Sequence, residues 1–89
     1  MKKERYVYVV CGVCHDYDGI AYPIFSNNHA VHTSMAKAQA ELDDILNESQ
    51  EEADLNGYTM TSNRGDDWLD IEYETGTIEK YQIYRSKIN

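Results

Sequence analysis

Glycine, proline and long apolar runs are scarce in this sequence. One proline and five glycines among 89 residues exclude a collagen-like, linker-like or low-complexity chain. No segment approaches the roughly 20 apolar residues of a transmembrane helix. The start, MKKERYVYVV, has too short an apolar run and no small-residue cleavage site for a signal peptide. We therefore expect one domain over residues 1–89, located in the cytoplasm with both cysteines reduced.

Basic residues are also few. Eight Lys and Arg stand against sixteen Asp and Glu, so the formal net charge is −8. This sign disfavours direct binding to nucleic acid and to anionic membranes, which carry the same charge. It fits a basic protein partner, and it also fits an acidic surface that only keeps the domain soluble.

Five segments carry the β-branched and aromatic residues that are typical of strands. Pro23 cannot donate a backbone hydrogen bond, so its segment belongs at a sheet edge or a bulge. Thr75-Gly76 predicts the turn of a hairpin between the last two segments. The predicted strands are 5–14, 20–25, 58–62, 68–74 and 77–85.

Between the second and third of these segments, the apolar residues change period. From Val31 to Ile45 they recur at spacings of three and four, which predicts one long helix with a buried face. Asn56-Gly57 predicts its end, and SQEE at 49–52 leaves open a break near Asn47. The candidate N-caps are Ser26, Asn27, Asn28 and Thr33. The order ββαβββ predicts a two-layer α+β domain, an antiparallel sheet with the helix on one face.

Two cysteines and two histidines have nearly the spacing of a zinc finger. Cys11 and Cys14 are two residues apart, fourteen residues precede His29, and the His29–His32 gap is one residue short of the pattern. The CxxCH form also matches haem attachment, which requires an exported chain. Residues three apart on a straight strand point to opposite faces, so both thiols reach one ion only through a distorted strand. We interpret 9–19 as a core strand running into a turn, with no cofactor, and keep zinc as the alternative.

Catalysis has little support in the sequence. Cys14 with His29 or His32 is a conceivable nucleophile–base pair, which would give a cysteine-dependent enzyme. No nucleophile elbow and no Gly-rich phosphate loop accompany it. We therefore expect a protein that is not an enzyme.

The acidic residues form two rows. Asp70, Glu72 and Glu74 alternate on one side of a predicted strand. A second row steps at three and four along the solvent side of the predicted helix. Because like charges this close repel, such rows suggest a basic partner, and they can imitate the phosphates of nucleic acid. The candidate partner-binding residues are Asp66, Asp67, Asp70, Glu72, Glu74, Glu41, Asp44 and Glu48, with Trp68 as an anchor or a cover for the open sheet face.

Three segments carry a resemblance to known proteins: VYVVCGV, the IFS that leads into the predicted helix, and the acidic DDWLDIEYE. With them the chain resembles small acidic phage and mobile-element proteins of the anti-CRISPR and anti-defence type. The resemblance implies a non-enzymatic inhibitor of a basic, nucleic-acid-binding defence enzyme in the host cytosol, and it assigns no residue roles. A small zinc-binding domain and an α+β domain of other role remain alternatives. A homodimer through the uncovered sheet face is compatible with each.

Overall fold

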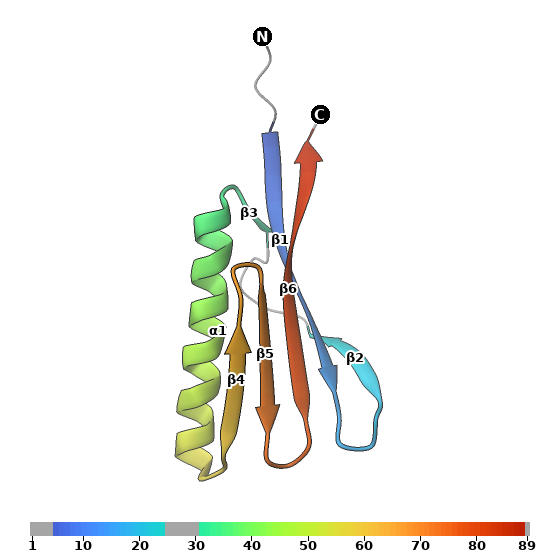
Figure 1. Ribbon diagram of the computed structural model, residues 1–89, viewed down its shortest axis with the longest axis vertical. Coiled ribbons are helices and arrows are strands. Elements are labelled where there is room, and N and C mark those ends of the chain that lie inside the picture. The colour runs from blue at the N-terminus through green and yellow to red at the C-terminus, as the bar shows by residue number, and fades with distance from the viewer. Residues whose placement is uncertain (1–4, 25–30, 89) are drawn as a thin grey trace.

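The computed structural model describes residues 5–24 and 31–88 (Figure 1). Its elements are β1 (Arg5–His15), β2 (Ala21–Ile24), β3 (Val31–His32), α1 (Met35–Asn56), β4 (Met60–Arg64), β5 (Trp68–Tyr73) and β6 (Ile78–Ile88). All strand pairs are antiparallel, in the order β2-β1-β6-β5-β4, and β3 pairs with the same β1. Because α1 packs on one face of this sheet, the predicted two-layer α+β architecture is confirmed.

The helix begins later than its apolar period suggests. Ser34 is the N-cap, and its Oγ accepts a hydrogen bond from the Lys37 backbone N–H at 3.2 Å. Val31, predicted on the buried helix face, instead lies in β3 opposite Val9 and is 55% exposed. The helix ends at Gly57 as predicted, where a φ of 72° suits glycine.

Two other expectations about the helix have clear outcomes. The possible break near Asn47 is absent, because α1 runs unbroken from Met35 to Asn56. Of the four candidate N-caps, Thr33 lies one residue before the actual cap. The other three, Ser26, Asn27 and Asn28, lie outside the described residues.

The core lies between α1 and the middle of the sheet. Leu42 of α1 meets Leu69 and Ile71 of β5, and all three are fully buried. Tyr81 of β6 reaches this core by lying over Gly12 of β1, since a Cβ there would stand 2.7 Å from the tyrosine ring. The predicted alternation along β5 is therefore confirmed, with its apolar residues directed to the helix.

The turns and edges follow the local sequence. β2 is an edge strand, as Pro23 predicts. In the β1–β2 turn Gly19 has a φ of 86°, and its N–H donates to the Asp16 carbonyl at 2.9 Å. The β5–β6 turn places Gly76 at a φ of 96°, which confirms the predicted hairpin.

β1 and β6 extend beyond the rest of the sheet as a two-stranded ribbon (Figure 1). Their pairing continues to Arg5 and Ile88, whereas β5 pairs with β6 only up to Gln82. Along this ribbon the Arg85 guanidinium lies 4.5 Å from the centre of the Tyr6 ring, a cation–π contact. Arg5, Arg85 and Lys87 therefore lie together on this ribbon, away from most of the acidic residues in the described part of the chain.

Candidate functional site

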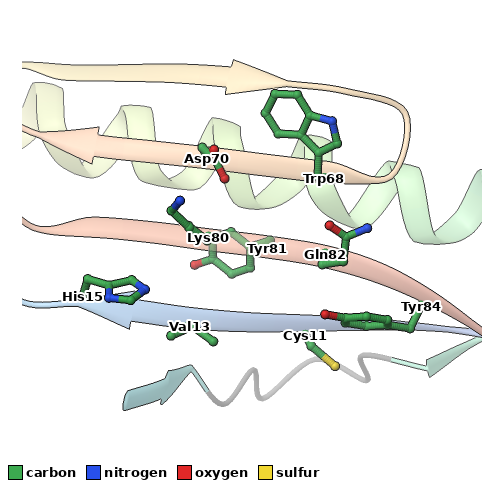
Figure 2. Close-up of a pocket in the computed structure, with 9 residues that line it drawn as sticks. All are labelled: Cys11, Val13, His15, Trp68, Asp70, Lys80, Tyr81, Gln82 and Tyr84. Carbon is green, nitrogen blue, oxygen red and sulfur yellow. The ribbon is translucent and has the colours of Figure 1, made fainter. Parts of the chain in front are cut away.

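The sheet face turned away from α1 is the first candidate surface, and we call it the open face. α1, the one helix in residues 5–24 and 31–88, lies on the other side. A groove of about 470 Å³ crosses the open face between β1, β6 and β5 (Figure 2). Its apolar lining comes mainly from Val13, Cys11, Trp68 and Tyr84. The Trp68 indole lies against Gly65, where any Cβ would overlap the ring, so this glycine lets the indole sit close to the backbone.

The open face is electrically balanced. The charged residues at its strand positions in the described ranges are Arg5, Asp70, Glu72 and Lys80. Two are basic and two are acidic, so their formal charges cancel. Asp70 and Lys80 are also direct cross-strand neighbours, and Figure 2 shows them side by side on β5 and β6. The net charge of −8 therefore resides elsewhere on the molecule.

The second candidate surface, which we call the acidic surface, combines the outward side of α1 with the β4–β5 turn. The turn is tied to the helix through Gln39, whose Nε2 donates to the Asp66 carbonyl at 3.0 Å. Arg64 donates to the Gln39 carbonyl at 3.0 Å and pairs with Asp43 at 2.8 Å. The acidic surface consists of the exposed residues Asp43, Asp44, Glu48, Glu51, Glu52, Asp54, Asp66 and Asp67.

The helix end of the acidic surface is electrostatically unfavourable. Glu51, Glu52 and Asp54 lie in the last turns of α1, where the helix dipole favours cations, and the last turn has no basic residue. Asp44 and Glu48 stand four residues apart and repel one another. Within residues 5–24 and 31–88, the one ion pair on this surface joins Asp43 to Arg64.

The structure distributes the predicted partner-binding residues over both surfaces. Asp44, Glu48 and Asp66 are exposed on the acidic surface. Asp67 is exposed in the same turn, but its Oδ2 accepts a hydrogen bond from Gln82 Nε2 of the open face at 3.2 Å, so it borders both surfaces. Trp68, Asp70 and Glu72 lie on the open face, at alternate positions of β5. Glu74 lies beyond the end of β5, where its Oε1 accepts a hydrogen bond from the Thr59 backbone N–H at 2.9 Å. It therefore supports the start of β4 and does not extend the strand row.

The expectation that Glu41 faces solvent is wrong. Its side chain is only 10% exposed, and its Oε1 lies 2.8 Å from His32 Nε2, in β3. Its other oxygen, Oε2, is buried with no hydrogen-bond partner among the described residues. The spacing of the helix residues indicates this inward position, because Glu41 lies three residues after buried Ala38 and four before half-buried Ile45, on the same side of the helix.

The described members of the predicted zinc set do not converge. Cys11 is exposed on the open face, whereas Cys14 is buried on the helix side of the same strand. His32 pairs opposite Tyr8, six residues from Cys14 and thus about 20 Å along β1. His29 lies outside the described residues, and no group of three or more potential ligands occurs within the described ranges. The same separation keeps Cys14 away from His32 as a nucleophile–base pair.

A thiol and tyrosine cluster on the helix side of the sheet was not anticipated from the sequence. The Cys14 thiol donates to the Tyr22 hydroxyl at 3.4 Å, and the Tyr81 hydroxyl donates to Glu79 Oε1 at 2.8 Å. The hydrogen bond with Cys14 is the main cause that raises the pKa of Tyr22 to about 12. Burial, followed by Glu79, raises the pKa of Tyr81. The only signal in the sequence was the high number of tyrosines, eight in all.

Two further tyrosines belong to the same region. The rings of Tyr58 and Tyr73 meet edge to face, with their centroids 5.6 Å apart. Burial is the largest cause that raises the pKa of each phenol. Ionisation of these hydroxyls is therefore disfavoured in the folded chain, as it is for Tyr22 and Tyr81.

An alkaline titration should show these four phenols as a late phase. Because their pKa values are raised on folding, the stability they contribute is present below about pH 10 and declines as the pH rises through the folded-state values. Phenolate absorbance of the folded chain should lag behind that of the chain in denaturant. Cys14→Ala should move Tyr22 into the earlier phase, and Tyr22→Phe should remove one phenol from the late phase. Coincident curves for the folded and denatured chain would contradict the cluster.

No helix in the described part of the chain has the length and apolar character that crossing a bilayer requires. Comparison of the chain with protein-family models, with curated proteins and with solved structures found no match. Its function must therefore be inferred from its own two surfaces.

Proposed function

We propose that the protein is a non-enzymatic binding module that docks onto a basic protein through its acidic surface. The observation that carries this proposal is the separation of charge between the two sides of the domain. The open face sums to zero, whereas eight exposed carboxylates gather on the outer side of α1 and the adjoining turn. A basic partner would meet this side first, because long-range attraction steers it there.

The electrostatics of α1 support the same proposal. Each like-charge pair four residues apart costs an isolated helix about 0.2–0.5 kcal/mol. The Asp44–Glu48 and Glu48–Glu52 pairs both have this spacing, and no described cation is paired with either. A cationic partner would relieve this repulsion on binding, so docking would recover free energy that the free chain lacks.

More specifically, we propose that the protein inhibits a basic partner that binds nucleic acid. A protein surface that grips the phosphates of nucleic acid is rich in Lys and Arg, and the acidic surface would compete for it. This is the activity that the resemblance to anti-defence inhibitors implies. The inward position of Glu41 and the local role of Glu74 shorten both predicted rows, so competition for the basic surface is favoured over imitation of a regular phosphate backbone.

Charge neutralisation at two sites tests the acidic surface. Asp44→Asn with Glu48→Gln should weaken binding of a Lys- and Arg-rich probe peptide about fivefold, since two exposed ion pairs contribute about 1 kcal/mol in total. The matched control is Asp16→Asn with Asp18→Asn in the β1–β2 turn, which changes the net charge equally. Fluorescence anisotropy of the labelled peptide measures both affinities, and the binding of the unaltered chain should weaken with added salt.

The control decides between docking and simple net charge. Equal losses of affinity in the two variants would mean that the acidic surface only adds to solubility. If the protein is an inhibitor, it should also displace a DNA oligonucleotide from the probe peptide. Failure of displacement with intact peptide binding would remove the inhibitor and leave the binding module.

A further inference from the structure

The open face carries several large apolar side chains that are exposed to solvent. Val13 is 39% exposed, Val31 55% and Tyr84 56%, and all three lie on this face. Around them the half-buried Val9 and Trp68 complete an apolar centre. Apolar area left in water forgoes about 25 cal/mol per Å², so a second layer on this side would stabilise the protein.

The charge of the open face restricts what can cover it. A strongly basic partner would gain little electrostatic attraction there, because the formal charges at the strand positions of this face cancel and Asp70 already neighbours Lys80. An acidic partner gains equally little. A face that is itself apolar and neutral overall is complementary to another of the same kind, and a second copy of this chain supplies one.

The size of the face is sufficient for a dimer. At about 3.3 Å per residue and about 4.8 Å per strand, the five strands from β2 to β4 span about 600 Å² in projection. The relief of the side chains and the groove of about 470 Å³ add to the accessible area. This approaches the roughly 800 Å² per partner of a standard stable interface.

Face-to-face packing also keeps the acidic surfaces apart. Two sheets stack about 10 Å from one another, and each α1 would lie beyond its own sheet on the outer side. The two acidic surfaces are therefore farther apart than the sheets themselves, and thus farther than the Debye length of about 8 Å at physiological salt. Salt therefore screens the repulsion between them. Each acidic surface would remain free for the basic partner, and the dimer does not depend on that function.

We propose that the open face is a homodimer interface, in which the sheets of two copies pack face to face around a two-fold axis near Cys11. In an isologous contact, residues close to the axis meet their own copies. Cys11 lies in the middle of β1, opposite Gln82 of β6, and these are the two longest strands of the sheet. Its exposed thiol on this face serves as a probe of the axis, whereas the Cys14 thiol is buried on the other side.

Analytical ultracentrifugation of the full chain tests the dimer. The mass should approach twice the 10.3 kDa of one chain as concentration rises. Tyr84→Lys, at an exposed site on the open face, should raise the dimer dissociation constant at least about tenfold. The matched control is Tyr17→Lys in the β1–β2 turn, which is 76% exposed and outside the face, and it should leave the dissociation constant unchanged. Circular dichroism confirms that both variants fold.

Cross-linking then locates the axis. A short bismaleimide should join two native chains through Cys11, and Cys11→Ser should abolish the product while Cys14→Ser keeps it. A monomer at all concentrations would overturn the proposal, as would equal dimerisation of the two lysine variants. A dimer that does not cross-link through Cys11 would also overturn it, since the contact would then lie on another surface. Binding of the basic peptide is measured separately, so either proposal can fail alone.

Discussion

Replacing His32 with alanine is expected to lower the free energy of unfolding by about 3 kcal/mol, because it leaves the largely buried carboxyl group of Glu41 without its hydrogen-bond partner. The side chains of His32 and Glu41 are 20% and 10% exposed, and His32 Nε2 lies 2.8 Å from Glu41 Oε1. With His32 gone, neither Glu41 oxygen would have a hydrogen-bond partner among the described residues. In a domain of this size the loss corresponds to a melting temperature lower by about 15 °C.

A double substitution separates the polar contact between His32 and Glu41 from general packing. His32→Ala with Glu41→Leu removes both polar partners, so it should be more stable than His32→Ala alone. Guanidinium unfolding followed by circular dichroism measures all the variants, including Glu41→Leu, and completes a double-mutant cycle. A cost below about 1 kcal/mol for His32→Ala, or additive effects in the cycle, would show that water reaches Glu41.

The parts of the fold that could be predicted from the sequence are those encoded by local period. Along β5 the alternation of Leu69 and Ile71 with Trp68 and Asp70 sets one face against the helix and the other away from it. The apolar spacing of α1 likewise determines which side of the helix is buried. Gly57 ends the helix because no tertiary contact is needed to favour a positive φ at glycine.

The sequence-based predictions for Val31 and Glu41 are wrong where two local patterns fit the same residues. Val31 continues the helical spacing, yet it is also a β-branched residue that pairs with Val9, and only tertiary pairing decides between these outcomes. The inward position of Glu41 depends on the same β3 segment, because His32 supplies its partner. The sequence does not reveal β3, so Glu41 is counted with Asp44 and Glu48 in the predicted acidic row on the helix, although only the latter two are exposed.

Spacing also misleads where it ignores the faces of a strand. The predicted zinc set counts residues along the chain, whereas the unbroken pairing of β1 puts Cys11 and Cys14 on opposite sides. The neutrality of the open face was equally hidden, because it depends on the register that sets Lys80 beside Asp70. Charge totals predict an acidic protein, but only the register shows which side carries the charge.

Gly12→Val is expected to destabilise the protein by about 3 kcal/mol, although valine favours strands more than glycine does. The Cβ alone would stand 2.7 Å from the Tyr81 ring and 3.2 Å from Ile24 Cβ. Tyr81 is buried in the core, so its ring cannot move aside without opening the contact with α1. Strand propensity and packing therefore predict opposite signs, and the unfolding free energy distinguishes them.

The matched control is Cys11→Val, at the neighbouring position of the same strand on the open face, which should be close to neutral. Tyr81→Leu should tolerate Gly12→Val better than the native chain does, since the smaller side chain vacates the space over β1. A stabilised Gly12→Val variant would show that Tyr81 does not lie over this glycine. The same contact joins β1 to β6, the central strands of the open face. Gly12→Val should therefore also weaken dimerisation, and Cys11 cross-linking measures that loss under conditions in which circular dichroism shows the variant to be folded.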